Sequence, residues 1–190
     1  MRLGDVSDIR TGLVLSRKKA QIESDIIKKY KTLTLKSFNE DGILNLDDLE
    51  DFDSTEKLDE RYLTQKGDVV IRLSHPNTAI YISDNITGYI IPSQFSVIRL
   101  GVESLIPEFL SIYLNSTKVK KKIYKSQFGA TIPVIKNSFL ENLRINDLSI
   151  DRQKAIVDIH NLHLKEKELL KGLIDEKEML FKAVFSQLIK

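Results

Sequence analysis

Hydrophobic positions along the chain follow a period of two before residue 107 and a helical period after it. Before residue 107, β-branched and aromatic residues alternate with polar ones, or form short apolar runs, at residues 32–35, 69–73, 79–82, 89–91 and 95–100. Turn residues separate these runs, as at 39–42 and 84–88. Such a pattern is typical of antiparallel strands in a curled sheet or small barrel. We therefore predict such a sheet, preceded by one short helix over residues 17–30 whose buried side would hold Ala20, Ile22, Ile26 and Ile27.

The helical period begins at Pro107, which fits the first turn of a helix because its missing N–H is not needed there. The apolar face of this helix is predicted to consist of Phe109, Leu110, Ile112, Tyr113, Val119 and Ile123. The spacing of Ser138 and Glu141 matches a capping box and predicts a second short helix. A last strand is expected over residues 143–145.

The residues from Asp151 to the end predict one long helix, since they contain no proline and a single glycine, Gly172. Asp151 is the expected N-cap. At 1.5 Å per residue the helix would reach about 60 Å, roughly twice the width of a small domain. Apolar residues recur along it at three- and four-residue steps and form a stripe of Ile156, Ile159, Leu162, Leu169, Leu170, Leu173, Leu180, Val184 and Leu188.

A helix of this length cannot bury its whole stripe on the domain that precedes it, so a partner helix is expected. Glu166 and Lys177 fall on the stripe and exclude a strict heptad coiled coil. A loose antiparallel pair or a four-helix bundle is favoured. The predicted fold is therefore α+β, with a β-rich head over residues 1–148 and a spacer and dimerisation helix over residues 149–190.

Composition and charge narrow the class of protein. The chain has 190 residues, no cysteine and a hydrophobic content of 42%, which suits a folded domain without disulfides. The first residues form no apolar leader, and no apolar run approaches the ~18 residues of a membrane span. We expect a soluble, cytoplasmic protein. The net charge of +2 hides an acidic segment at 40–60 and a lysine cluster at 118–125.

Residues suited to catalysis or to a cofactor are not grouped in any pattern that points to an enzyme. His160 and His163 are three residues apart on the predicted helix, but no third ligand is near them, so no metal is expected. The sequence has no glycine-rich phosphate loop, no nucleophile elbow and no zinc-protease motif. We expect neither catalysis nor a cofactor.

The order of several short motifs resembles the target recognition domains of type I restriction–modification specificity subunits. The opening Leu-Gly-Asp-Val at 3–6, with Ile9 and Gly12, is similar to their start. Lys-Gly-Asp-Val-Val-Ile-Arg at 66–72 resembles a strand of that family, and the stretch 89–99 resembles the strand pair that follows. Residues 106–116 resemble its Ile-x-Pro helix, and 129–133 its glycine-centred loop. Residues 151–157 resemble the start of its long helix.

The resemblance implies a function for both parts of the chain. A complete family subunit carries two recognition domains and two long helices, so this chain resembles half a subunit. Two copies would pair their helices antiparallel and read a two-part, palindromic site on double-stranded DNA. The family's subunits do not catalyse; they hold DNA methyltransferase (modification) subunits and, through them, the restriction subunit at the chosen sequence.

Candidate DNA contacts follow from side-chain chemistry, because the family has no fixed residue code for bases. Polar side chains on loops read base edges, whereas flexible lysines suit phosphates. The base-reading candidates are Arg72, Ser74, His75, Asn77, Thr78, Ser93, Gln94, Gln127 and Thr131. The phosphate-binding candidates are Lys118, Lys121, Lys122 and Lys125.

Two other classes of protein remain open at this point. A dimeric DNA-binding regulator unrelated to restriction would use the same head and spacer without a methyltransferase partner. A helical adaptor would instead bind a protein partner with its β head, and the acidic segment would form the binding surface. Failure to bind any duplex, with retention of a protein partner, would favour the adaptor.

Overall fold

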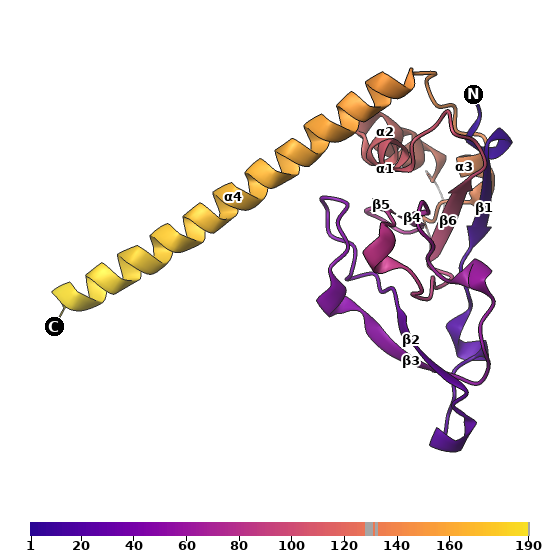
Figure 1. Ribbon diagram of the computed structural model, residues 1–190, viewed down its shortest axis with the longest axis horizontal. Helices are drawn as coiled ribbons and strands as arrows, with labels where there is room; N and C mark the ends of the chain where they lie inside the picture. The colour runs from indigo at the N-terminus through magenta and orange to yellow at the C-terminus, as the bar shows by residue number, and fades with distance from the viewer. Residues whose placement is uncertain (128–130, 132, 190) are drawn as a thin grey trace.

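The structure, a computed structural model, describes residues 1–127, 131 and 133–189. It confirms the predicted α+β class: a β-rich head carries one long helix that projects far from it (Figure 1). The head holds strands β1 (Ser7–Thr11), β2 (Lys28–Thr32), β3 (Glu50–Ser54), β4 (Val69–Arg72), β5 (Ala79–Tyr81) and β6 (Phe95–Leu100). Its helices are α1 (Pro107–Asn115), α2 (Thr117–Ser126) and α3 (Asn137–Glu141), and the long helix is α4 (Ile150–Leu188).

The head is built on a four-stranded antiparallel sheet with the strand order β1-β6-β4-β5. A separate two-stranded sheet pairs β2 with β3. In this small sheet basic and acidic residues lie opposite each other: Lys29 faces Asp53, and Lys31 forms an ion pair of 3.0 Å with Asp51. The acidic segment noted in the sequence is therefore partly neutralised by β2 and does not form an unopposed acidic surface.

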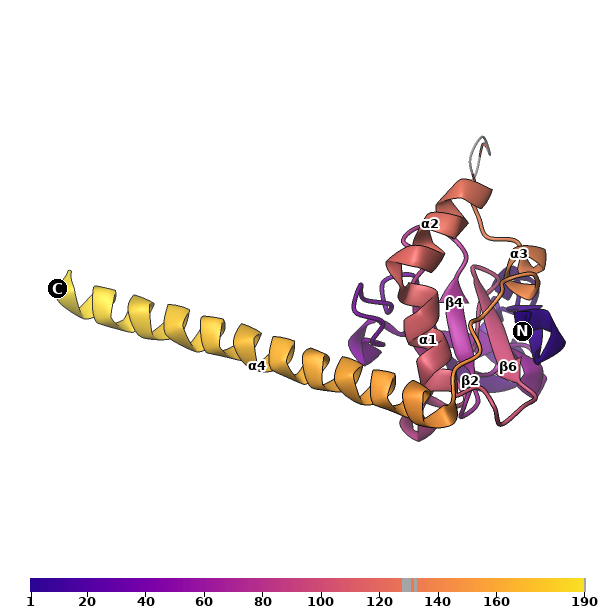
Figure 2. The same cartoon turned by 90° about the horizontal axis from the view of Figure 1, so that it is seen from above.

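The alternation of side chains along the strands divides the core into two layers. Val69 and Ile71 point toward α1 and α2 and join the larger apolar cluster, which also contains Leu110 and Leu114. The intervening Val70 points to the opposite face, where it packs in a second cluster with Leu33, Phe38 and Phe95. Figure 2 shows α1 and α2 following one another over the sheet. Because β4 is buried on both faces, it appears in the sequence as a continuous apolar run.

The prediction of a helix over residues 17–30 is wrong. This stretch forms two single-turn 3-10 helices, η2 (Leu15–Arg17) and η3 (Glu23–Asp25), and then β2. Ile22 and Ile27, expected on the buried side of a helix, are 61% and 68% exposed. Buried Tyr30 and Thr32 instead follow the period of a strand, so β2 begins four residues before the predicted strand at 32–35.

Three other boundaries differ from the predictions. The helix expected from Pro107 is two helices, because Ser116 is extended and its side chain accepts a hydrogen bond from the Val119 N–H as the N-cap of α2. The expected strands at 89–91 and 143–145 are reduced to isolated bridges at Ile90 and Arg144. The long helix begins at Ile150 with Ser149 as its N-cap, so Asp151 lies in the first turn, where a carboxylate favours the positive end of the helix dipole.

Gln153 anchors the start of α4 to the head. Its side chain is 2% exposed and makes three hydrogen bonds: Oε1 accepts from the Ile106 N–H at 2.8 Å, and Nε2 donates to the carbonyls of Ser104 at 2.8 Å and Leu148 at 2.9 Å. These bonds satisfy backbone groups on both sides of the junction between head and helix. The glutamine was noted in the sequence only as part of a family resemblance.

Gln153→Ala is expected to destabilise the protein by about 2–4 kcal/mol, because it leaves one backbone donor and two acceptors unpaired at a buried site. Chemical unfolding followed by circular dichroism measures the change. Lys154→Ala, at the exposed neighbouring position, is the matched control and should change stability by less than about 0.5 kcal/mol. Equal stability of the two variants would mean that the junction does not depend on this side chain.

The rest of α4 has two different faces. Val157, His160 and Leu164 are partly buried against the head, whereas Ile159 and Leu162 are 68% and 71% exposed. From residue 168 to 189 every side chain is exposed. Ile156, predicted as part of the free stripe, packs partly on the core of the head. The remaining stripe residues (Leu169, Leu170, Leu173, Leu180, Val184 and Leu188) are 47% to 78% exposed.

Candidate nucleic-acid interface

Several candidate base-reading segments, separate in sequence, meet at one end of the four-stranded sheet. Strand register places Arg72 beside Phe95, Thr11 beside Ser96, and Ala79 beside Ile71. The turns 73–78 and 92–94 therefore emerge at the same end as the last residue of β1. Ser74 also bridges to Val134, which brings the segment after α2 to this end. We refer to these loops together as the loop end of the head.

The turn between β4 and β5 is held by its own polar side chains. The Arg72 guanidinium donates from Nε to Ser74 Oγ at 3.1 Å and from Nη1 to the Leu35 carbonyl at 3.3 Å. Asn77 adopts a positive φ of 55°, which asparagine tolerates better than most residues, and its Nδ2 donates to the Leu73 carbonyl at 2.8 Å. Asn77 and Thr78 are 4% and 2% exposed. Of the candidates in this turn, His75 alone is fully exposed, while Arg72 and Ser74 are half-buried.

Lys120 joins this turn to the basic helix α2. Its Nζ donates to the carbonyls of Pro76 and Asn77, each at 2.6 Å. Burial lowers the pKa of Lys120 to about 8. The lysine cluster therefore contains one member with a structural role, and it is the lysine that the predicted phosphate contacts leave out.

The other lysines of α2 are exposed, and two of them, Lys121 and Lys125, lie beside the same turn. Lys118, Lys121, Lys122 and Lys125 all point to solvent, as does Tyr124, which is 70% exposed. Lys121, Tyr124 and Lys125 form one wall of a groove of about 340 Å³ whose other wall is His75 and Pro76. An exposed aromatic ring among lysines suits contact with a nucleic acid, and sequence inspection did not single out Tyr124.

A second groove, of about 500 Å³, contains the other predicted turn. Ser93 and Gln94 line it together with Ser16, Thr34 and Lys36 from two further segments. Gln94 is exposed, and its backbone carbonyl accepts from the Leu73 N–H at 3.0 Å, which ties the two predicted turns together. Ser16, Thr34 and Lys36 were not predicted, because nothing in the sequence indicates that their loops meet Gln94.

The two candidates that follow α2 have different surroundings. Gln127 is the C-cap of α2 and half-buried, and its Nε2 is buried without a hydrogen-bond partner among the described residues. Thr131 is exposed. Most of the glycine-centred loop expected at 129–133, including Gly129, lies outside the described residues.

Asn137 fastens the first residues of α3 to the loop end. Its Oδ1 accepts from Ser96 Oγ at 2.6 Å, and its Nδ2 donates to Thr11 Oγ1 at 3.1 Å. Two strands and a helix are thus joined at the edge of the candidate interface. Partners 126 residues apart in sequence cannot be identified from local pattern, so this contact was missed.

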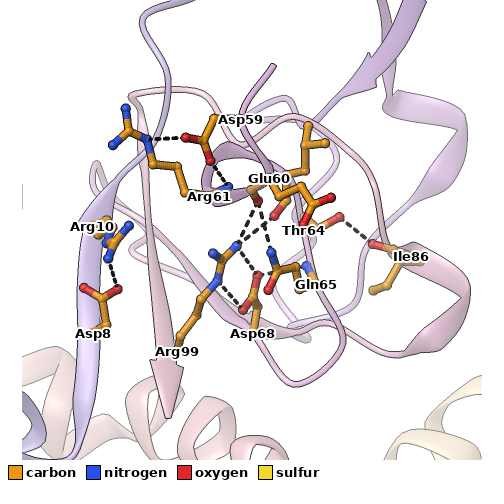
Figure 3. A network of polar contacts seen from close by, with 11 residues as sticks. Asp8, Arg10, Asp59, Glu60, Arg61, Thr64, Gln65, Asp68, Ile86 and Arg99 are labelled. Carbon is orange, nitrogen blue, oxygen red and sulfur yellow. Dashed lines mark hydrogen bonds and ion pairs between the residues drawn. The ribbon is translucent and has the colours of Figure 1, made fainter. Parts of the chain in front are cut away.

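The opposite end of the sheet carries a buried ion pair (Figure 3). The Arg99 guanidinium donates to both carboxylate oxygens of Asp68, at 2.9 Å and 3.2 Å, and to the Leu63 carbonyl at 2.9 Å. Burial raises the pKa of Asp68, partly offset by hydrogen bonds from Arg99 and the Gln65 N–H. The Lys-Gly-Asp motif therefore has a structural explanation: its aspartate fixes the turn before β4, with Gly67 at a φ of 87°.

The chain thus combines a β-sheet head, with polar turns and a basic helix gathered at one end, and a long, largely exposed helix. The chain belongs to the family of the type I restriction modification DNA specificity domain, which matches residues 1–178. The family resemblance noted in the sequence is thereby confirmed. No curated protein matches the sequence.

Three solved structures share the fold. A chain of a type I R-M system, described for its complex assembly and conformational transition, is 16% identical with a TM-score of 0.65, covering 90% of this chain and 43% of its own length. The HsdS subunit from Thermoanaerobacter tengcongensis is 19% identical with a TM-score of 0.65, covering 89% and 43%. A type I S subunit from M. genitalium is 14% identical with a TM-score of 0.52, covering 95% and 43%. The chain thus spans less than half the length of these proteins.

The described residues contain neither a membrane-spanning helix nor a cluster of metal ligands. None of the helices there combines the length and the apolar character that crossing a membrane requires. No group of three or more histidine, aspartate or glutamate side chains in this part of the chain is arranged to hold a metal ion.

Proposed function

We propose that the chain is a non-catalytic, sequence-reading subunit of a type I restriction–modification system. In this proposal the head binds double-stranded DNA with its loop end, and α4 pairs with a second copy of the chain. The observation that carries the proposal is the convergence of the turns 73–78 and 92–94 with the lysines of α2 at one end of the sheet. Family membership supplies the general role.

The exposed lysines of α2 are the proposed phosphate contacts. Lys118, Lys121, Lys122 and Lys125 are mobile point charges on one helix, and that helix is tied to the turn by Lys120. Phosphate contacts of this kind position a protein on the duplex without reading its sequence. Tyr124 would add a contact to the sugar–phosphate backbone beside them.

Base reading is proposed for the exposed polar side chains of the two grooves. His75 and Gln94 are the leading candidates, because both are exposed on turns that the sheet holds in place. Ser93, Gln127 and Thr131 are secondary candidates at the rim. Arg72, Ser74, Asn77 and Thr78 are proposed to hold the shape of the turn, since their polar groups are bonded within it or buried.

The spacer role rests on the exposed apolar stripe of α4. Two copies paired antiparallel would cover this stripe and place two heads on one duplex, so that a two-fold protein reads a two-fold site. The modification subunit, and the restriction subunit through it, would then be brought to that site. Both partners are inferred from the family and not from a surface of this chain.

Selection of bound duplexes from a random library tests the proposal. The unaltered chain is expected to enrich a defined sequence, and Gln94→Ala should lower affinity for that sequence by about 1–3 kcal/mol through the loss of preference at one base position. Gln65→Ala, an exposed glutamine at the opposite end of the sheet, is the matched control. Equal weakening on every sequence would make Gln94 a backbone contact, and no binding to any duplex would overturn the proposed function.

A further inference from the structure

Beyond Gln153 and the partly buried side chains of Val157, His160 and Leu164, α4 also contacts the head through an ion pair. Lys167 Nζ donates to Oδ1 of Asp41, which lies on the turn at residues 39–43. The two residues are 126 positions apart in sequence. Lys167 is also the last residue of α4 that is partly buried, so this pair marks the point at which the helix leaves the head.

The turn that carries Asp41 is held firmly in place. The Ile43 N–H donates to Asn39 Oδ1 at 2.9 Å, and Gly42 adopts a φ of 77°. A Cβ atom on Gly42 would lie 2.9 Å from Nδ2 of Asn115, so the turn is in close contact with α1. Asn115 is in turn fixed by two hydrogen bonds to the backbone of Ala79, at 2.9 Å and 2.7 Å. Asp41 is therefore a fixed point on the head.

The charges around Asp41 favour the pair. The hydrogen bond from Lys167 lowers the pKa of Asp41, opposed by burial and reinforced by the charges of Lys167, Lys171 and His163. Asp41 is ionised at neutral pH. The side chains of Lys167 and Asp41 are 40% and 25% exposed, so the pair is only partly screened by water.

With Gln153 fixed, a small displacement at Lys167 produces a larger displacement at the end of α4. Lys167 lies 14 residues from Gln153, and Leu188, the last helical residue, lies 35 residues from it. At a constant rise per residue, a sideways shift at Lys167 is magnified about 2.5-fold at the end of α4. A gap of ~3 Å, enough for a water between the two charges, would thus move the end of the helix by roughly 7 Å.

We propose that Asp41 and Lys167 are positioning residues whose ion pair sets the direction in which α4 leaves the head. The pair adds little to the stability of the fold, as is usual for exposed ion pairs. Its effect is on geometry: without it, α4 pivots about the Gln153 anchor. On the proposed function, which this inference extends, the pair also narrows the range of half-site spacings that a dimer accepts.

Distances between two spin labels measure the direction of α4 without any DNA. Because the chain has no cysteine, single cysteines at Lys57 on the head and Lys182 on the helix can be labelled without competing sites, and dilution with unlabelled protein removes distances between chains. Asp41→Asn and Lys167→Met are each expected to broaden the distance distribution and shift its mean by on the order of 5 Å. The thermal midpoint of both variants should stay within about 2 °C of the unaltered chain.

A variant with the two charges exchanged and a matched control test whether the Asp41–Lys167 ion pair sets the direction of α4. The double variant Asp41→Lys with Lys167→Asp restores the pair in reverse and should recover the narrow distribution. Lys165→Met removes the ion pair with Glu168 within α4 and should leave the distribution unchanged. Unaltered distances in both single variants would overturn the inference, whether or not the protein binds DNA. Broadened distances with an unchanged tolerance for half-site spacing would instead contradict the proposed spacer function.

Discussion

Replacing Leu173 and Val184 by glutamate is expected to turn a dimer into a monomer and to weaken binding to a two-part DNA site by about 10²–10⁴-fold. Both side chains are about half exposed in the single chain, at 48% and 47%, and belong to the stripe proposed to pair with a second copy. Two buried, unpaired carboxylates would oppose that pairing. Sedimentation velocity measures the oligomeric state, and titration of a labelled duplex measures the affinity.

The matched control places similar changes on the other side of the same helix. Lys182→Gln with Ser186→Glu alters the net charge by the same amount, and both residues lie on the face of α4 away from the stripe. This variant should remain dimeric. If the unaltered chain is itself a monomer at concentrations where it binds a two-part site tightly, the pairing of helices is not what joins the heads.

The second large effect is expected from the lysines of α2. Changing four of them to glutamine should lower the affinity of each head for every duplex by about 10²–10³-fold at low salt. The slope of log affinity against log salt should fall by about 3–4 for each bound head, because each phosphate contact releases counterions. The sequence preference of the residual binding should not change. The four positions are Lys118, Lys121, Lys122 and Lys125.

A control with the same loss of charge separates local contacts from net charge. Glutamine at Lys66, Lys154, Lys165 and Lys182 removes four exposed lysines that lie outside the loop end. If this control changes the salt slope as much as the α2 variant does, the DNA does not lie along α2. The phosphate contacts would then have to be sought elsewhere on the head.

Elements with a strong local signal were predicted well from the sequence. The strand β6 lies at the predicted residues, β4 and β5 each end one residue early, and the N-cap of α4 is Ser149, two residues before the expected Asp151. In each case a run of apolar residues or a long helical period is bounded by clear turn or capping residues. The prediction failed at 17–30, where Ile22 and Ile27 suggested a buried face that the structure leaves exposed.

The residue types of the candidate site could be predicted from the sequence, but their spatial arrangement and burial could not. Polar turns and a lysine cluster could be found in the sequence, yet their meeting at one end of the sheet depends on strand order, which no local pattern specifies. Asn77 shows the limit most clearly. It has the chemistry of a DNA-contacting residue, but it is buried and its amide is bonded to the backbone inside the fold.

The role of α4 as a spacer is tested most directly by the dependence of binding on half-site spacing. Duplexes would carry two inverted copies of the selected half-site, with the gap between them increased one base pair at a time. At 1.5 Å per residue, α4 is about 58 Å long, or about 1.7 turns of B-DNA. We predict one sharp optimum of affinity, which is lost within a few base pairs as the second half-site rotates away. Affinity that is independent of the gap, or equal to that of a single half-site at every gap, would contradict it.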